Sequence, residues 1–204
     1  MNKSLTRDMI VARLAQRTEA PESARGDYDL NPELVPSGGP LTPAAVLVPL
    51  VDRAEGMTVL FTQRTDHLEH HPGQISFPGG HVEEADGAPE AAALRETEEE
   101  TGIAPHFVNV IGRLDEYVTR TGFSVIPVVG VLTPDFSLDP DPFEVSEVFE
   151  VPLDFFLDAA NHQRHCRVLN GKDRHFYAMP YGDYFIWGAT AGMLKNLYDC
   201  LVRP

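Results

Sequence analysis

The chain has 204 residues, of which 43% are hydrophobic and 23% charged, and its net charge at pH 7 is −15. This composition predicts one globular domain with ample material for a core, and its acidity argues against a general nucleic-acid binder, which needs a basic surface. No apolar run reaches the roughly 18 to 20 residues of a membrane-spanning helix, and the N-terminus lacks the apolar stretch of a secretory signal. The two cysteines, Cys166 and Cys200, form no spaced metal or redox motif. We therefore expect a cytoplasmic protein without disulfides and without nucleic-acid or membrane partners.

The first 43 residues are predicted to form a short helix and an irregular lead-in. Residues 4–17 place apolar side chains at helical spacing behind Ser4, a residue suited to cap a helix N-terminus. Residues 19–43 contain five prolines, which disfavour regular structure. We therefore divide the chain into an N-terminal helix and lead-in, residues 1–43, and a main domain, residues 44–204.

Strands dominate the first part of the main domain. Apolar runs at 44–51 and 57–62 flank a turn at 53–56 and predict a hairpin. A short strand at 74–77 then runs into Pro78-Gly79-Gly80. A helix over 89–101 follows, entered around residues 86–89 with proline in its first turn, and Gly102 ends it.

Short strands and two further helices make up the rest of the domain. Strands are predicted at 108–114, 117–118, 124–132, 147–151, 166–169, 175–179 and 184–187. Helices are predicted at 152–160 and 190–201. The strand–loop–helix order around Gly80, with strands on both sides, predicts an α+β fold in which helices pack against a central mixed sheet.

Most of the negative charge lies in two segments. Residues 81–100 carry eight acids and one base, Arg95, and residues 135–150 carry six acids and no base, so the remainder of the chain is close to neutral. Charge runs usually form solvated surface, which is the simpler interpretation. The alternative hypothesis is a cation site assembled from both segments.

Three glutamates share one face of the helix predicted over 89–101. At 100° per residue, Glu96, Glu99 and Glu100 fall within an arc of about 100°. Like charges one turn apart destabilise a helix by roughly 0.2–0.5 kcal/mol per pair, and a bound cation would offset that repulsion. Mg²⁺ prefers carboxylate oxygens and leaves room for substrate phosphates, and Arg95 can orient a carboxylate. For these glutamates alone, a solvated face would be the simpler interpretation.

The glutamates belong to a longer motif. Gly80 is followed by Arg95-Glu96-Thr97-Glu98-Glu99-Glu100-Thr101-Gly102-Ile103. This arrangement resembles the Nudix box, whose pattern is glycine, five residues, glutamate, seven residues, then Arg-Glu-aliphatic-any-Glu-Glu-any-Gly-aliphatic. The chain departs from the pattern in three ways: Asp86 stands for the first glutamate, eight residues precede Arg95, and Thr97 replaces an aliphatic residue. We assign no role to Asp86, and the glutamate triad is intact.

The stretch before Gly80 contains a second motif, which indicates a subgroup within the family. It begins Leu60-Phe61-Thr62-Gln63-Arg64-Thr65 and ends Gly73-Gln74-Ile75-Ser76-Phe77-Pro78-Gly79-Gly80. It is similar to the accessory motif of the coenzyme A pyrophosphatase subgroup of Nudix hydrolases, LLTxRSxxxRxxxGxVxFPGG, except that Glu69 stands where that motif has arginine. A box with one extra residue is also typical of that subgroup. The two motifs join without a gap over residues 60–103.

The resemblance implies a Nudix-type α/β/α sandwich over residues 44–204 and a metal-dependent hydrolase. The expected reaction cuts coenzyme A into 3′,5′-ADP and 4′-phosphopantetheine, with Mg²⁺ or Mn²⁺ as cofactor. The expected metal ligands are Glu96, Glu99 and Glu100. The expected catalytic residues are Glu99, Glu147 and Arg95, with Glu144 as the alternative general base to Glu147. The expected substrate contacts are Arg64, Gly79 and Gly80.

Several alternatives stay open from the sequence. The substrate could be ADP-ribose, NADH or another nucleoside diphosphate derivative, or the chain could be a Nudix-like module that senses a nucleotide without cutting it. A cation for the 3′-phosphate of coenzyme A could come from Arg113, Arg120 or Lys172. The histidines at 67, 70, 71, 162 and 165 form no spaced metal set. The oligomeric state is open, with a homodimer among the options.

Overall fold

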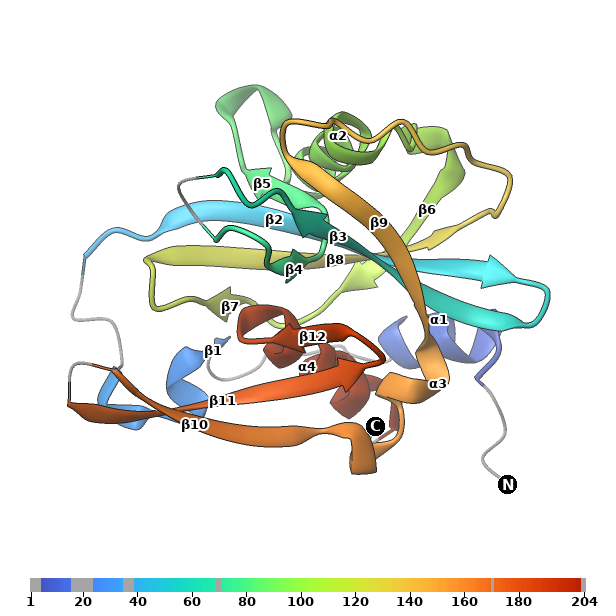
Figure 1. Cartoon of the computed structure of the whole chain (residues 1–204). Helices are drawn as coiled ribbons and strands as arrows, with labels where there is room; N and C mark the ends of the chain where they lie inside the picture. Colours follow the sequence, from blue (N-terminus) through green and yellow to red (C-terminus); the bar gives the residue numbers. More distant parts are fainter. Residues whose placement is uncertain (1–4, 16–23, 35–38, 69–70, 170, 203–204) are drawn as a thin grey trace.

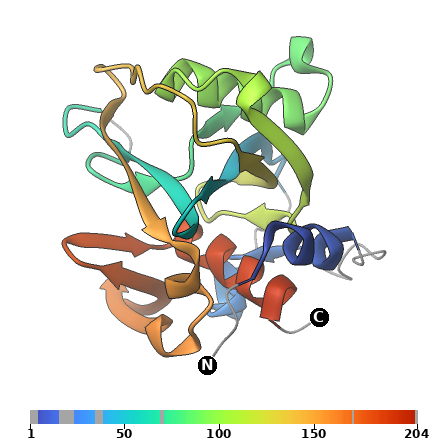
Figure 2. The same cartoon turned by 90° about the vertical axis from the view of Figure 1, so that its right-hand side faces the viewer.

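The structure is a computed structural model that describes residues 5–15, 24–34, 39–68, 71–169 and 171–202. Helix α2 (Pro89–Thr101) covers one face of a central mixed sheet, and helix α4 (Ala189–Val202) packs on the other face beside a small second sheet (Figure 1). The view turned by 90° shows the same layers, with α2 above the central sheet and the small sheet below it (Figure 2). The predicted α+β sandwich with a central mixed sheet is confirmed.

Nine of the described strands form the central sheet. Its order is β1-β7-β8-β2-β3-β4, and β5, β6 and β9 pair with β2, β8 and β3. These strands are β1 (Arg25–Gly26), β2 (Thr42–Arg53), β3 (Gly56–Arg64), β4 (Ile75–Ser76), β5 (Gly79–His81), β6 (Val108–Arg113), β7 (Tyr117–Val118), β8 (Phe123–Leu132) and β9 (Val145–Pro152). The sheet is mixed because β2 runs parallel to β8 and antiparallel to β3.

The small sheet and the remaining helices complete the described chain. The small antiparallel sheet contains β10 (Gln163–Leu169), β11 (Lys172–Tyr181) and β12 (Tyr184–Trp187). The other α-helices are α1 (Arg7–Ala15) and α3 (Leu153–Phe156). Short 3-10 turns are η1 (Asp27–Asp29), η2 (Pro32–Leu34), η3 (Glu84–Asp86), η4 (Pro105–Phe107) and η5 (Ala159–Asn161).

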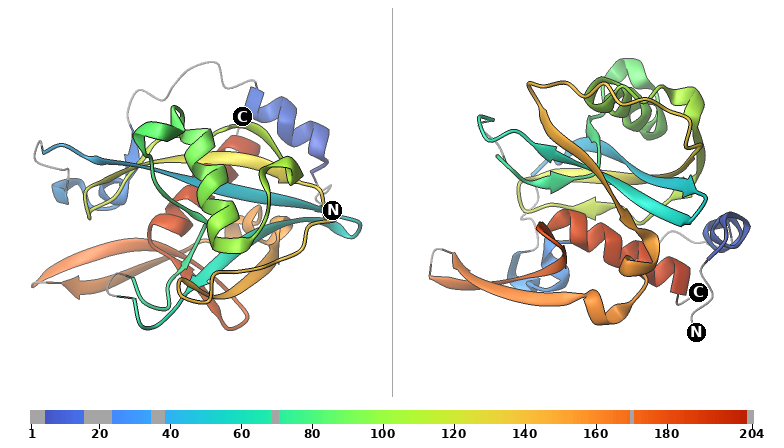
Figure 3. Two further views of the ribbon diagram at one scale, coloured as in Figure 1. Left: turned by 90° about the horizontal axis from the view of Figure 1, so that it is seen from above. Right: turned by 45° about the vertical axis from the view of Figure 1, so that its right-hand side comes forward.

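Strand β2 is buried on both faces, and its alternating side chains supply two cores. Val48 and Leu50 join the core that contains Leu194 of α4, whereas Leu47 joins the core that contains Ala92 of α2. A strand covered on both faces has a continuous apolar sequence, which is why residues 44–51 lack the polar alternation of a half-exposed strand. Seen from above, α2 crosses over this part of the sheet (Figure 3).

Helix α2 begins and ends where its sequence predicts. Pro89 occupies the first turn, where its missing N–H costs no hydrogen bond, and Gly102 ends the helix in a left-handed conformation with φ of 77°. Thr97 and Thr101 are fully buried, and each hydroxyl donates a 2.6 Å hydrogen bond to the carbonyl four residues earlier. A threonine is therefore tolerated where the Nudix box has an aliphatic residue, because its polar atom is satisfied within the helix.

The helix predicted over 152–160 is wrong beyond its first turn. Helix α3 ends at Phe156, and η5 follows as a separate 3-10 turn. Asp158 separates the two, with extended backbone angles and a side chain that accepts a 2.9 Å hydrogen bond from the Ala160 N–H. Aspartate offers the backbone this local bond in place of a helical one, and the apolar pattern alone did not reveal it.

The N-terminal segment packs onto the main domain. Helix α1 confirms the predicted N-terminal helix within residues 7–15, while Ser4 and residues 16–17 lie outside the described residues. Ile10 and Leu14 are buried in the core that α4 also joins. Strand β1 pairs in parallel with β7, so part of the lead-in predicted to be irregular extends the central sheet.

Candidate active site

Helix α2 carries the three predicted glutamates and gives each a different environment. Glu100 is only 6% exposed and Glu96 is half-buried, whereas the Glu99 side chain is 60% exposed. Solvent exposure therefore differs along the predicted glutamate face: Glu100 lies inside the protein, and Glu99 lies in solvent.

Arg95 connects the outer carboxylates of this face. Its guanidinium donates to Glu96 at 2.9 Å and to Glu99 at 3.1 Å, and it donates to the two Asp86 oxygens at 3.0 and 3.1 Å. Asp86 also accepts a hydrogen bond from the Glu83 N–H at 2.8 Å, and the Arg95 hydrogen bond is the main cause that lowers the pKa of Asp86. Asp86 thus anchors Arg95 on the side away from the glutamates.

The role of Asp86 was missed in the sequence, although a signal was available. An arginine has five N–H donors in a fixed fork, and two neighbouring glutamates do not satisfy all of them. Asp86 is the sixth residue after Gly80, where the Nudix box has its first glutamate, and one extra residue lies between Asp86 and Arg95. The 3-10 turn η3 and a left-handed Gly87 accommodate that extra residue. Sequence spacing shows the extra residue but does not show the turn that absorbs it.

The backbone before the helix approaches the glutamates closely. A Cβ added at Gly80 would lie 2.5 Å from the carboxyl carbon of Glu96. A Cβ at Gly79, whose φ is 152°, would collide with the Ala45 carbonyl, and the Gly79 N–H lowers the pKa of Glu100. A Cβ at Gly79 would thus meet backbone, whereas a Cβ at Gly80 would displace the Glu96 carboxylate. Both glycines let β5 approach the acidic face of α2 closely.

Glu100 has a strongly perturbed carboxyl group. The pKa of this carboxyl is raised to about 8: burial is the largest cause, the guanidinium of Arg64 and the Gly79 N–H lower the pKa, and the charges of Glu144 and Glu96 raise it. The Oε2 atom of Glu100 is buried without a hydrogen-bond partner. A buried carboxylate oxygen with no partner is unfavourable unless a proton or a cation approaches it.

The chemistry of these donors fits a divalent metal ion. The orphaned Oε2 of Glu100 and the carboxylates of Glu96 and Glu144 are hard oxygen donors of the kind that Mg²⁺ and Mn²⁺ prefer. They are not preassembled: within the described ranges, no three acidic, histidine or cysteine side chains gather closely enough to hold an ion. Arg95 binds the carboxylates of Glu96 and Glu99, whereas the Glu100 carboxyl lies deeper, near Arg64.

The structure brings one of the two candidate base glutamates to this site. Glu144, in the loop before β9, is close enough to raise the pKa of Glu100. Glu147 lies on β9 itself and accepts a 2.7 Å hydrogen bond from the Tyr184 hydroxyl of β12. Since side chains alternate along a strand, Glu147 shares a face with Phe149, which belongs to the core on the α4 side of the sheet. Glu147 is therefore not placed with the glutamates of α2.

The three cations considered for a distant phosphate lie apart from one another. The Arg113 guanidinium is paired with Glu90 at 2.6 Å, and Lys172 is exposed on β11. Arg120 lies near Asp27, to which its backbone N–H donates a 2.8 Å hydrogen bond. Glu69 and His70 lie outside the described residues. None of the three cations is singled out as a phosphate contact.

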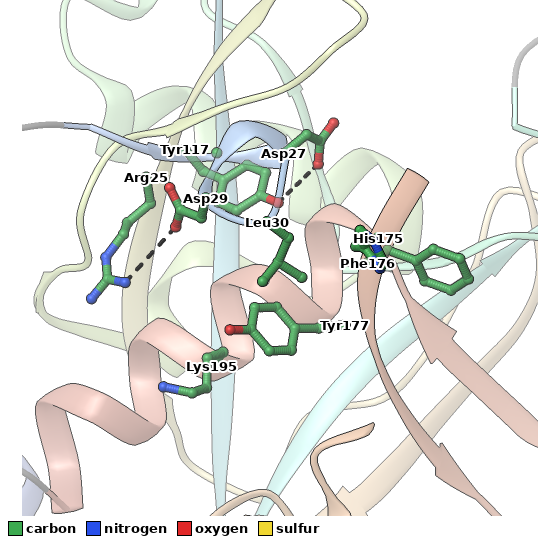
Figure 4. A pocket seen from close by; sticks show the side chains of 12 residues that line it. Arg25, Asp27, Asp29, Leu30, Tyr117, His175, Phe176, Tyr177 and Lys195 are labelled. Carbon is green, nitrogen blue, oxygen red and sulfur yellow. Dashed lines mark hydrogen bonds and ion pairs between the residues drawn. The ribbon is translucent and has the colours of Figure 1, made fainter. Parts of the chain in front are cut away.

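A small pocket lies between η1, β11 and α4 (Figure 4). The Arg25–Asp29 ion pair at 3.8 Å and the Tyr117–Asp27 hydrogen bond at 2.9 Å form part of its wall. Its volume of about 30 Å³ accommodates one or two water molecules and is far too small for a nucleotide. This pocket does not extend the acidic site at α2.

Known proteins identify the family. A family model described as NUDIX domain matches residues 41–169, which include α2, Arg64 and the Gly79–Gly80 pair. This chain is a Nudix hydrolase. Two relatives, each named uncharacterized Nudix hydrolase NudL, come from Enterobacter sp. (strain 638) and Escherichia coli (strain K12). Each is 43% identical over 154 residues, which cover 76% of this chain and 80% of the relative.

A solved structure supports the Nudix fold. The MutT/nudix family protein from Enterococcus faecalis matches 98% of this chain and 76% of its own, with a TM-score of 0.52 and 16% sequence identity. As a Nudix hydrolase, the chain acts on diphosphate bonds, and α2 carries the acidic face of the Nudix box. None of the described helices has the length and apolar character needed to cross a membrane.

Proposed function

We propose that this Nudix hydrolase cleaves coenzyme A or a derivative of it into 3′,5′-ADP and 4′-phosphopantetheine. The proposal depends mainly on the position of Arg64. Arg64 belongs to the upstream motif of residues 60–80, and its charge acts directly on the buried Glu100 carboxyl of the Nudix box. A guanidinium beside the acidic face provides the cation that a diphosphate would need there.

Other residues of the upstream motif pack in the core on the α4 side of the sheet. The rings of Phe61 and Phe77 stack with centroids 5.2 Å apart, and Phe77 is buried. The Thr62 hydroxyl lies 3.3 Å from the Ser76 hydroxyl across the β3–β4 pair. These contacts fix the chain that leads into Gly79 and Gly80, so part of the motif is structural and Arg64 is its candidate for substrate contact.

The proposed mechanism gives each charged side chain a distinct task. Glu96, Glu99 and Glu100 would hold Mg²⁺ or Mn²⁺, and Arg95 would orient Glu96 and Glu99. Such an ion, when bound, offsets the diphosphate charge and lowers the pKa of the attacking water. Arg64 donates charge-assisted hydrogen bonds to the diphosphate, and Glu144 accepts the proton of the water, with Glu99 and Glu147 as competing candidates for the base.

The test is a comparison of diphosphate substrates. The protein is incubated with Mg²⁺ and, in separate reactions, coenzyme A, dephospho-coenzyme A, ADP-ribose and NADH, and the products are identified by mass. We expect coenzyme A to have the highest kcat/KM and to yield 3′,5′-ADP, and dephospho-coenzyme A to differ mainly in KM. Comparable kcat/KM values for ADP-ribose and coenzyme A would refute the substrate assignment and leave the diphosphate chemistry in place.

A cytoplasmic location is part of the proposal. Coenzyme A and its derivatives are intracellular metabolites, and the exposed Cys166 is a free thiol. An unpaired exposed thiol suits a reducing compartment. Fractionation of cells that express the protein would test the location independently of the substrate.

A further inference from the structure

A second, larger pocket opens where β12 lies beside the edge strand β4. Its volume is about 360 Å³, within the range of small-molecule sites. One wall is the segment Pro72–Ile75, which belongs to the upstream motif, and the facing wall is Asp183–Phe185 with Trp187. Aromatic residues of β12 and the amide residues Gln63 and Gln74 therefore line the same pocket.

The pocket shares its walls with the strands that carry the proposed active site. Gln63 lines the pocket, and Arg64 is the next residue of β3. The backbone N–H of Arg64 donates a 2.9 Å hydrogen bond to the Gln74 backbone carbonyl in the pocket wall. On the other side, the Tyr184 hydroxyl bonds to Glu147 of β9, three residues beyond Glu144. Side chains alternate along β3, so Gln63 shares the α4-side face with Phe61, whereas Arg64 acts on Glu100 on the α2 side. A ligand that places its diphosphate at Arg64 would therefore reach the pocket by passing around the edge strand β4.

The charge of the residues that line the pocket favours an uncharged end of the ligand over a phosphate-bearing end. Among the described residues, those that line the pocket include one acid, Asp183, and no lysine or arginine. Glu147 adds a second negative charge next to Tyr184. A phosphate-bearing nucleotide would be repelled here, whereas an uncharged chain with amide groups could hydrogen-bond to Gln63 and Gln74 and pack on the rings.

We propose that this pocket binds the uncharged, amide-containing pantetheine arm of the substrate, while the nucleotide half lies on the other side of Arg64. This inference rests on the proposed function and adds a specificity site to it. The rings of Tyr184, Phe185 and Trp187 supply the apolar surface, and the Gln63 and Gln74 amides supply the polar contacts. ADP-ribose has no such arm, so the pocket would distinguish the two substrates.

Trp187 is the only tryptophan of the chain, so its fluorescence reports directly on the pocket. In metal-free buffer, the protein is titrated with pantetheine and, separately, with 3′,5′-ADP. We expect pantetheine to change the emission in a saturable way and 3′,5′-ADP to leave it unchanged. A change with 3′,5′-ADP alone, an equal change with both, or no change with either would overturn the proposal.

A variant with a matched control tests the link to catalysis. Phe185 is 44% exposed, so Phe185→Ala should fold, and it keeps the tryptophan. We expect it to weaken the pantetheine response and raise KM for coenzyme A several-fold, with kcat retained. The control Val168→Ala, at a 68% exposed position of β10 outside the pocket, should change neither value.

The outcomes separate the pocket from the proposed function. Wild-type protein that fails to cleave coenzyme A would refute the proposed function, while the fluorescence titration would still decide whether the pocket binds the arm. An unchanged KM in Phe185→Ala, beside normal turnover of coenzyme A by the wild type, would refute the pocket alone.

Discussion

The Glu100 carboxyl opposes folding whenever it is ionised and no cation is nearby. It is almost fully buried, its Oε2 atom has no hydrogen-bond partner, and Glu144 and Glu96 add negative charge around it. Arg64 and the Gly79 N–H offset only part of this cost, because the pKa is still raised to about 8. An acid kept in such surroundings is typical of a functional site.

The first prediction follows from the sign of this pKa shift. The folded protein binds the Glu100 proton more tightly than the unfolded chain, whose carboxyl titrates near 4.5. In metal-free buffer, this group therefore destabilises the fold progressively as the pH rises from about 4.5 to about 8. Glu100→Gln removes the effect, so its melting temperature should exceed that of the wild type at pH 8 and approach it at pH 5.

Thermal unfolding in EDTA, measured across this pH range, checks the prediction. Glu98→Gln is the matched control, because Glu98 lies on the same helix but is exposed. The melting temperatures of Glu98→Gln and of the wild type should change in parallel as the pH rises. If the curve of Glu100→Gln also ran parallel to that of the wild type, burial of an ionisable Glu100 would be refuted.

The second prediction concerns the close approach of Gly80 to Glu96. The Cβ of Gly80→Ala would meet the Glu96 carboxylate, which is the mobile end of a side chain and can move away. We expect little loss of stability and a loss of kcat of at least about tenfold, equivalent to about 1.4 kcal/mol, because Glu96 leaves its position. Gly39→Ala, with nothing within 4 Å of the added Cβ, is the control and should retain full activity. Full activity in Gly80→Ala would remove Glu96 from the site.

Residue identities could be predicted from the sequence better than residue environments. The spacing of Glu96, Glu99 and Glu100 placed them on one helix, and they lie there. Their graded exposure depends on how α2 sits against β5 and on the loop before β9, which are contacts between distant segments. The same limit applies to Asp86, whose contact with Arg95 depends on the turn η3.

At the scale of elements, strand alternation separates the two candidate bases. Glu144 precedes β9 and faces the glutamates of α2, whereas Glu147 is bonded to Tyr184 on the opposite side of the sheet. The third prediction is that Glu144→Gln lowers kcat by about 10²-fold or more, as expected for loss of general-base catalysis. Glu147→Gln should keep kcat within a few-fold of the wild type.

The pH profile of kcat distinguishes loss of a base from a structural defect. Glu144→Gln should lose the acidic limb of the profile and retain its melting temperature, whereas Glu147→Gln should keep the limb. The reverse assignment of the two variants would return the base to Glu147. Equal, small effects of both would favour Glu99 as the base.

Elements with strong local signals were predictable, and those made by tertiary contacts were not. The helix at 89–101 has a proline at its start and a glycine at its end, so its limits agree with the structure. Strand β1 has two residues and exists because β7 pairs with it, which no local pattern encodes. Strand β10 begins at Gln163, before the predicted start, because β11 provides its partner along the whole length.

At the scale of the whole molecule, the fold brings the two acidic segments together. The N–H groups of Asp139 and Asp141 donate to the carbonyls of Thr101 and Glu100, at 2.9 and 3.1 Å. These bonds satisfy carbonyls at the end of α2, but they also set acids beside the negative end of the helix dipole. The loop then continues to Glu144. The cation site assembled from both segments stays a prediction, and the approach of Glu144 to Glu100 is the contact between the segments that motivates it.

The fourth prediction is that a divalent cation stabilises the whole fold. A ligand that binds only the native state adds about 2.7 kcal/mol when its concentration is 100 times Kd. For a chain of this size, each kcal/mol raises the melting temperature by roughly 2–4 °C, so saturating Mg²⁺ should raise it by roughly 5–10 °C. Removal with EDTA should reverse the rise.

Differential scanning fluorimetry over a range of Mg²⁺ concentrations measures this effect, with NaCl at matched ionic strength as the control. Sodium should give a much smaller rise, because it screens the acidic segments without coordinating the carboxylates. In Glu100→Gln the Mg²⁺ response should fall to the level of the sodium control, since the buried oxygen donor loses its charge. An equal rise in melting temperature with NaCl and MgCl₂ in the wild type would show that screening alone stabilises the acidic segments. The assignment of Glu96, Glu99 and Glu100 as metal ligands in the absence of substrate would then be refuted.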